Sequence, residues 1–213
     1  MNFSEIKTEA KNKMKGHFWE IFGPFAILIG INLLLGTITG KSYDEETFNV
    51  FNLSLDTLAG FFISIIGMAY SCYLLNFIRT GKSDFDSFFE IIKNKWVLFL
   101  VISILIGVFT TLWSLLLIIP GIIAALSYSQ AKFIGYDNEL QGYDCIKKSK
   151  EMMKGYKWNY FLFNLSFIGW YILGIFTFGI LYIWVIPYVE ISTALYYEKL
   201  KENNNTSNEA KTE

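Results

Sequence analysis

Long apolar segments alternate with short lysine-rich segments along most of this 213-residue chain. The apolar segments cover residues 18–39, 57–78, 96–136 and 158–198, and each of the last two contains 41 residues. A helix of about 20 apolar residues crosses the ~30 Å hydrocarbon core of a bilayer. The first two segments are therefore long enough for one crossing each, and the last two are long enough for two.

Each of the two longer segments contains turn residues near its middle. Pro120 and Gly121 interrupt the first, and Thr177, Phe178 and Gly179 interrupt the second, as expected where a chain reverses direction. The pattern predicts an all-α membrane protein whose six transmembrane helices form three hairpins. The predicted spans are 18–39, 57–78, 96–118, 121–136, 158–176 and 179–197. The fourth span is short, so a re-entrant segment is the alternative there.

The positive charges orient this arrangement. Six crossings place 17 of the 18 Lys and Arg residues on the side of the two termini, and only Lys41 lies in the loop 40–56 on the other side. Lys and Arg are enriched on the cytoplasmic side of a membrane. We therefore expect a multi-pass protein of the cell membrane with both termini in the cytoplasm. An odd number of crossings would scatter the lysines over both sides.

Three segments on the cytoplasmic side have the pattern of amphipathic surface helices: 1–17, 82–95 and, more weakly, 139–155. Their apolar stripes are Phe3, Ile6, Ala10 and Met14, then Phe85, Phe88, Phe89 and Ile92, then Cys145, Ser149, Met152 and Tyr156. A helix with such a stripe opposite lysines is expected to lie flat on a membrane. We expect a single membrane domain over 1–201, followed by a disordered polar tail at 202–213.

A short basic element that ends in tryptophan leads from each surface helix into the next hairpin, which indicates a threefold repeat. Gly or Asn would end the surface helix, Lys would meet anionic headgroups, and Trp would lie at the interface. The predicted interfacial anchors are Trp19, Trp96, Trp158, Lys15, Lys93 and Lys154. The expected partner is a bilayer that contains anionic lipids, and a protein partner or a homo-oligomer is left open.

Charged residues inside a bilayer are costly and mark candidate functional sites. Glu190 and Lys132 each lie 11 residues beyond a turn, at Gly179 and Gly121, which is about 16 Å along a helix. Aligning the two hairpins pairs Gln130 with Glu190. We therefore expect Glu190, Gln130 and Lys132 to meet inside the bundle, either to fix helix packing or to bind a proton or solute.

The composition argues against several other functions. The chain is 53% hydrophobic and 17% charged with a net charge of −1, so no basic field favours nucleic acid. His17 is the only histidine, and the two cysteines do not form a metal-binding pattern. No nucleophile, phosphate-binding or zinc motif occurs. We therefore predict no catalytic residue, no cofactor and no metal site.

Several stretches of the chain are distinctive. They are IPGIIAALSYSQAKFIGY at 119–136, IKKSKEMMKG at 146–155, LSFIGW at 165–170, Pro187-Tyr188, ALYYEKL at 194–200, and the N-terminal pattern of Ile6, Lys7, Ala10, Lys15 and Gly16. They resemble a family of bacterial integral membrane proteins known as domain of unknown function 975. The resemblance covers nearly the whole chain and is strongest over 119–200. It implies a membrane protein, mainly of Gram-positive bacteria, and it implies no activity.

These observations lead to one expected function and one alternative. The lysine-rich surface elements and the missing catalytic motifs favour a non-enzymatic protein that organises the membrane or assists a partner. The alternative is a small transporter or channel that uses polar residues of the fourth and sixth spans. An intramembrane enzyme is the least favoured class, because no acid–base pair or nucleophile cluster occurs.

Overall fold

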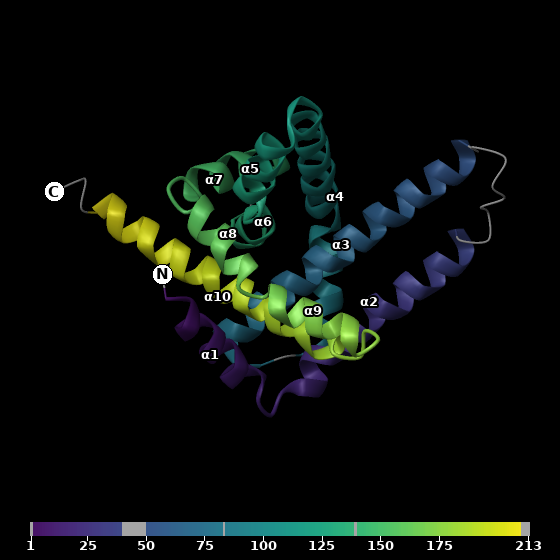
Figure 1. Cartoon of the computed structure of the whole chain (residues 1–213), viewed down its shortest axis with the longest axis horizontal. Helices are drawn as coiled ribbons and strands as arrows, with labels where there is room; N and C mark the ends of the chain where they lie inside the picture. The colour runs from purple at the N-terminus through teal and green to yellow at the C-terminus, as the bar shows by residue number, and fades with distance from the viewer. Residues whose placement is uncertain (1, 40–49, 83, 139, 210–213) are drawn as a thin grey trace.

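The computed structural model describes residues 2–39, 50–82, 84–138 and 140–209, and the regular structure within them is helical (Figure 1). The helices in chain order are α1 (Phe3–Met14), α2 (Phe18–Thr39), α3 (Val50–Thr80), α4 (Phe85–Leu116), α5 (Ile118–Tyr128), α6 (Ala131–Asp137), α7 (Gly142–Met152), α8 (Lys157–Leu165), α9 (Ile168–Phe176) and α10 (Tyr182–Glu209). The predicted all-α class is confirmed.

Four helical stretches among the described residues are long and apolar enough to cross a membrane: Phe18–Thr37, Thr57–Thr80, Phe85–Leu115 and Lys157–Phe176. They correspond to the first, second, third and fifth predicted spans. The predicted spans 121–136 and 179–197 are not among them. The chain breaks at Gln130 into the short helices α5 and α6, and α10 combines an apolar first half with a polar second half.

Helix α4 differs from the prediction because it is one continuous helix of 32 residues. The sequence predicts a surface helix over 82–95 and a separate span from Trp96. The side chain of Asp84 caps the start of α4 by accepting a hydrogen bond from the backbone N–H of Asp86 at 3.2 Å. Neither Gly nor Pro follows until Gly107, so the helix continues through Asn94, where the sequence predicts an end.

Two further predicted elements have different bounds. The predicted span 158–176 contains a turn at Ser166 and Phe167, which separates α8 from α9. The predicted tail is helical over residues 202–209, which extend α10, and residues 210–213 lie outside the described part of the chain. The prediction of a disordered tail is therefore wrong for residues 202–209, which continue the last helix.

The apolar stripes of two predicted surface helices are covered by protein. Ile6 and Ala10 of α1 are fully buried, and α1 lies against α10 (Figure 1). Cys145 and Ser149 of α7 are also fully buried. Gly142 lies so close to α4 that an added Cβ would be 2.3 Å from Val101 Cγ1. Both helices therefore pack on the helical bundle, whereas the sequence predicts that they lie flat on lipid.

Two parts of the predicted repeat share a backbone conformation. Gly16 follows α1 with φ of +86°, and Gly155 lies between α7 and α8 with φ of +85°. This left-handed conformation favours glycine and commonly ends a helix. The middle unit has no such turn, because Asn94 lies within α4. The repeat is therefore visible in the first and third units only.

Candidate functional site

Three polar side chains from three different helices meet inside the protein: Ser71 of α3, Lys132 of α6 and Glu190 of α10. The Lys132 ammonium donates to Ser71 Oγ at 2.8 Å, and the Ser71 hydroxyl donates to Glu190 Oε2 at 2.6 Å. The Lys132 and Glu190 charges are 3.3 Å apart. This group, which we call the Ser71–Lys132–Glu190 cluster, joins three helices with one ion pair and one hydroxyl bridge.

The cluster is largely shielded from the surroundings. The Ser71 residue is 1% exposed, and the side chains of Lys132 and Glu190 are 19% and 29% exposed. The backbone carbonyl of Lys132 also accepts a weak hydrogen bond from the Cys72 thiol at 3.6 Å. Buried charges are tolerated when they are paired and hydrogen-bonded. The cluster meets that condition, and it can hold helices together or exchange a proton.

Gln130, the third residue predicted for this cluster, makes different contacts. Its backbone N–H donates to Ser149 Oγ at 3.2 Å, and its side-chain amide donates to Ser129 Oγ at 3.0 Å. The Ser149 hydroxyl in turn donates to the carbonyl of Ser127 at 2.8 Å. Gln130 is fully buried, and within the described residues its Oε1 has no hydrogen-bond partner. Gln130 therefore belongs to the helix break between α5 and α6.

The sequence pattern does not single out Ser71 for this cluster. The alignment of the second and third hairpins could not find it, because Ser71 lies in the first hairpin. Its only signal is a hydroxyl in an otherwise apolar part of the predicted second span. Which serine of a span faces a charge is decided by helix rotation, and the weak amphipathicity of this span leaves that rotation unspecified.

A cavity of about 400 Å³ adjoins the Glu190 carboxyl group. It lies between α2, α3 and α10, and most of its lining is apolar, including Phe25, Leu28, Tyr70 and Ile186. An acidic side chain at the edge of an apolar cavity is suited to contact a cation or a polar group of an otherwise apolar molecule. The cavity gives the Ser71–Lys132–Glu190 cluster a space that a small ligand can occupy.

A second ionic group lies at the end of α6. Asp137 accepts hydrogen bonds from Arg79 Nη1 at 2.6 Å, Arg79 Nη2 at 2.8 Å, Lys201 Nζ at 2.8 Å and the Tyr197 hydroxyl at 2.9 Å. Arg79 also donates from Nε to Glu198 at 2.8 Å. Burial favours the neutral carboxyl group, but these donors outweigh it and lower the pKa of Asp137 to about 2. The group ties α6 to α3 and α10.

The predicted interfacial anchors lie on the protein surface. Trp19, Trp96 and Trp158 are 78%, 50% and 69% exposed. The three predicted lysine anchors, Lys15, Lys93 and Lys154, are exposed as well. These positions allow contact with lipid, and their role as anchors stays a prediction. Within the part of the chain that the structure describes, no three His, Cys, Asp or Glu side chains come together in a way that could hold a metal ion.

The helices and the buried cluster define an all-helical protein with several helices apolar enough to cross a membrane. Residues 114–204 match the family described as "Protein of unknown function (DUF975)". The resemblance to this family is confirmed over that region, which includes Lys132 and Glu190, and the N-terminal part of the resemblance lies outside it. A comparison with curated proteins and a comparison with solved structures each found no match.

Proposed function

We propose that this chain is a multi-pass protein of the cell membrane that works without catalysis, as an organiser of the bilayer or an accessory to a partner. Its proposed contact is with anionic lipids on the cytoplasmic side, where both termini lie, and nucleic acid is not a proposed partner. The observation that supports the proposal is the pattern of charges between the apolar segments, because six crossings would place 17 of the 18 Lys and Arg residues on one side of the membrane.

The charge distribution also decides the proposed number of crossings. If only the four candidate stretches crossed the membrane, residues 116–156 would lie outside the cell. That segment carries Lys132, Lys147, Lys148, Lys150 and Lys154, which the preference of lysine for the cytoplasmic side opposes. We therefore propose six crossings in three hairpins. In this arrangement the broken pair α5–α6 and the first half of α10 cross as well.

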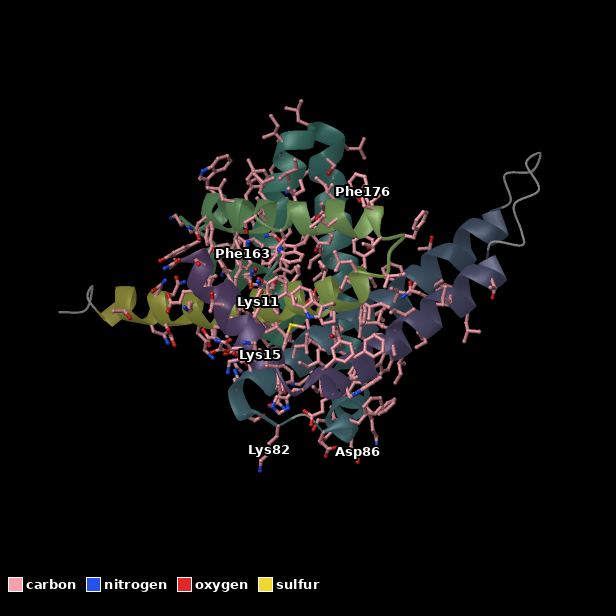
Figure 2. All side chains as sticks on the ribbon, turned by 60° about the horizontal axis from the view of Figure 1, so that its bottom comes forward. Lys11, Lys15, Lys82, Asp86, Phe163 and Phe176 are labelled. Carbon is pink, nitrogen blue, oxygen red and sulfur yellow. The ribbon has the colours of Figure 1, made fainter. Side chains whose placement is uncertain are left out.

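The placement of labelled residues supports this orientation. Figure 2 shows Lys82, which follows α3, at a distance from Phe176, the last residue of α9. The proposed arrangement puts Lys82 at the cytoplasmic side and Phe176 at the outer side. Phe176 and Phe178 at this turn are 77% and 99% exposed, as expected for side chains that face lipid.

Purification of the full chain in mild detergent, followed by mass spectrometry of everything that remains bound, tests the proposed function. We expect anionic lipids to be enriched relative to the source membrane, or a specific protein partner to be recovered. Purified protein that shows neither lipid enrichment nor a partner would contradict the proposal.

A small transporter or channel is the second candidate, and the Ser71–Lys132–Glu190 cluster beside its cavity favours it. Paired charges inside a membrane often belong to proton or solute pathways. The test reconstitutes the chain in vesicles that contain a pH-sensitive dye. If the cluster conducts protons, Glu190→Gln should abolish the flux while Glu202→Gln, an exposed change on the same helix, should preserve it. If the parent protein carries no proton flux and Glu190→Gln only lowers the yield, this candidate is rejected.

A further inference from the structure

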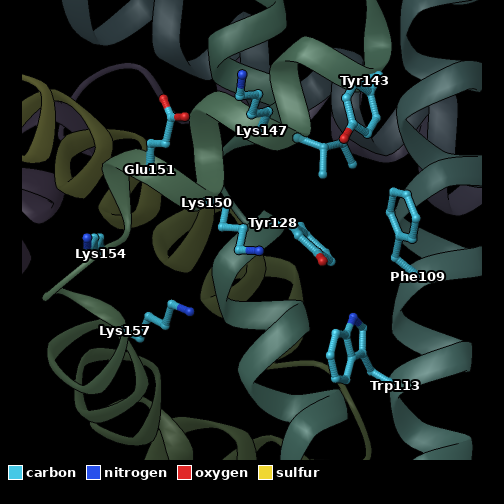
Figure 3. A pocket seen from close by; sticks show the side chains of 10 residues that line it. Phe109, Trp113, Tyr128, Tyr143, Lys147, Lys150, Glu151, Lys154 and Lys157 are labelled. Atoms are coloured by element: carbon cyan, nitrogen blue, oxygen red, sulfur yellow. The ribbon is translucent and has the colours of Figure 1, made fainter.

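A wide groove on the lysine-rich side is built from two chemically different walls. It has a volume of about 690 Å³ and lies between α4, α5, α7 and the start of α8. Figure 3 shows the charged side chains of α7 and the following turn across from Phe109 and Trp113 of α4, with Tyr128 of α5 between them. A groove of this volume is within the range of sites that hold small ligands.

The charged wall carries an excess of positive charge. Lys147, Lys150, Lys154 and Lys157 line it together with a single acid, Glu151. Across the described residues, no salt bridge joins these four lysines to an acidic side chain. Lysines that converge without acidic partners attract an anion. The charge excess therefore indicates a ligand with one or more phosphate or carboxylate groups.

The opposite wall is apolar and continues onto the outer surface of α4 and α5. Phe109, Trp113 and Tyr128 line the groove. Beyond Trp113, five large apolar side chains are 46–79% exposed: Leu115, Leu117, Ile119, Ile122 and Ile123. These side chains lie next to the turn predicted at Pro120 and Gly121. A soluble anion would not use this surface, whereas the acyl chains of a lipid would cover it.

We propose that this groove binds one anionic phospholipid, with its phosphate on the four lysines and its acyl chains along α4 and α5. The inference rests on the proposed function and adds a defined lipid site to it. Basic pockets between helices on the cytoplasmic side of a membrane suit anionic lipid headgroups, and the aromatic side chains of the opposite wall offer apolar contact to acyl chains. The site selects lipids by charge, and it favours phosphatidylglycerol over phosphatidylcholine.

The test compares two variants with equal changes in charge. Lys150→Gln/Lys154→Gln removes two groove lysines. The control Lys82→Gln/Lys148→Gln removes two exposed lysines outside the groove, one of which, Lys148, donates to Asn138 at 3.2 Å. Binding of fluorescent phosphatidylglycerol to the full chain in detergent micelles is measured, and thermal unfolding shows that both variants are folded. Each groove lysine removed is expected to weaken the affinity for phosphatidylglycerol about fivefold, and the pair about 25-fold. The affinity of the control should change little.

The possible results separate the groove from the general function. If both variants weaken phosphatidylglycerol binding equally, the proposed groove site is wrong, and the lipid contact is a general one between surface lysines and headgroups. A full chain with no preference for phosphatidylglycerol over phosphatidylcholine would overturn the groove and the proposed lipid contact together. Displacement of the lipid by equimolar inorganic phosphate or glycerol phosphate would show a site for a soluble anion and overturn the lipid. Trp113→Ala should weaken lipid binding, and an unchanged affinity would contradict the apolar wall.

Discussion

The carboxyl group of Asp137 offers a prediction whose size and pH dependence follow from the structure. Asp137→Asn keeps the shape of the side chain but removes a charge that Arg79, Lys201 and Tyr197 stabilise. Arg79 retains Glu198, whereas the structure shows no other acidic partner for Lys201 among the described residues. The substitution therefore weakens the contacts of α6 with both α3 and α10, while Arg79 and Glu198 still join α3 to α10.

The magnitude comes from the lowered pKa of Asp137. Its carboxyl group has a pKa of about 2, below the usual value of 3.8, and each pKa unit corresponds to about 1.4 kcal/mol. Without screening, the ionised carboxyl group would contribute about 2.4 kcal/mol to the free energy of unfolding. Arg79 and Lys201 are 31% and 41% exposed, so solvent screening reduces it to about 1–2 kcal/mol.

The sign of the pH dependence is fixed by the direction of this change. Because folding lowers the pKa of Asp137, the stabilisation is complete above about pH 4 and is lost as the pH falls towards 2. Thermal unfolding in detergent should show a lower Tm for Asp137→Asn than for the parent protein at pH 7. Between pH 4 and pH 2, the Tm of Asp137→Asn should fall less than that of the parent. Glu202→Gln, an exposed control on α10, should match the parent. An Asp137→Asn protein with the parent's Tm and pH profile would refute the reasoning.

Two further predictions concern the turn after α1 and the buried cluster. Gly16→Ala should destabilise the protein by about 1 kcal/mol because Gly16 has φ of +86°, while Gly30→Ala, in open space within α2, should leave the Tm unchanged or raise it, because alanine favours a helix more than glycine does. Lys132→Met should cost about 3 kcal/mol by leaving the Glu190 charge unpaired, and Lys132→Met/Glu190→Leu should recover most of this loss. A double variant less stable than Lys132→Met would contradict the ion pair.

The sequence was sufficient to predict elements whose ends carry strong local signals. Helix α1 ends before Gly16 and helix α7 ends before Gly155, and both glycines lie in the basic elements that indicated a helix end. The contact of Lys132 with Glu190 was also predictable, because two opposite charges at equal depth in an apolar segment are expected to pair. These features depend on local chemistry and on charge.

Other features depend on contacts that periodicity does not contain. The apolar stripe of Ile6 and Ala10 was expected to face lipid, but it faces α10, and a hydrophobic pattern does not distinguish lipid from protein as the covering surface. The break at Gln130 has no Gly or Pro to announce it. Ser149 stabilises it from α7 by accepting a hydrogen bond from the backbone of Gln130, a contact between residues 19 positions apart.

The most direct test of the account determines the side of the membrane on which α7 lies. One cysteine is added at exposed Lys148 or, as a reference, at Ser42 of the loop predicted to lie outside. Each variant is then labelled in intact cells with a membrane-impermeant maleimide. Burial raises the pKa of the native Cys145 thiol and limits its background labelling. The account predicts that Ser42→Cys is labelled in intact cells and Lys148→Cys only after permeabilisation. Labelling of Lys148→Cys in intact cells would contradict it and favour four crossings.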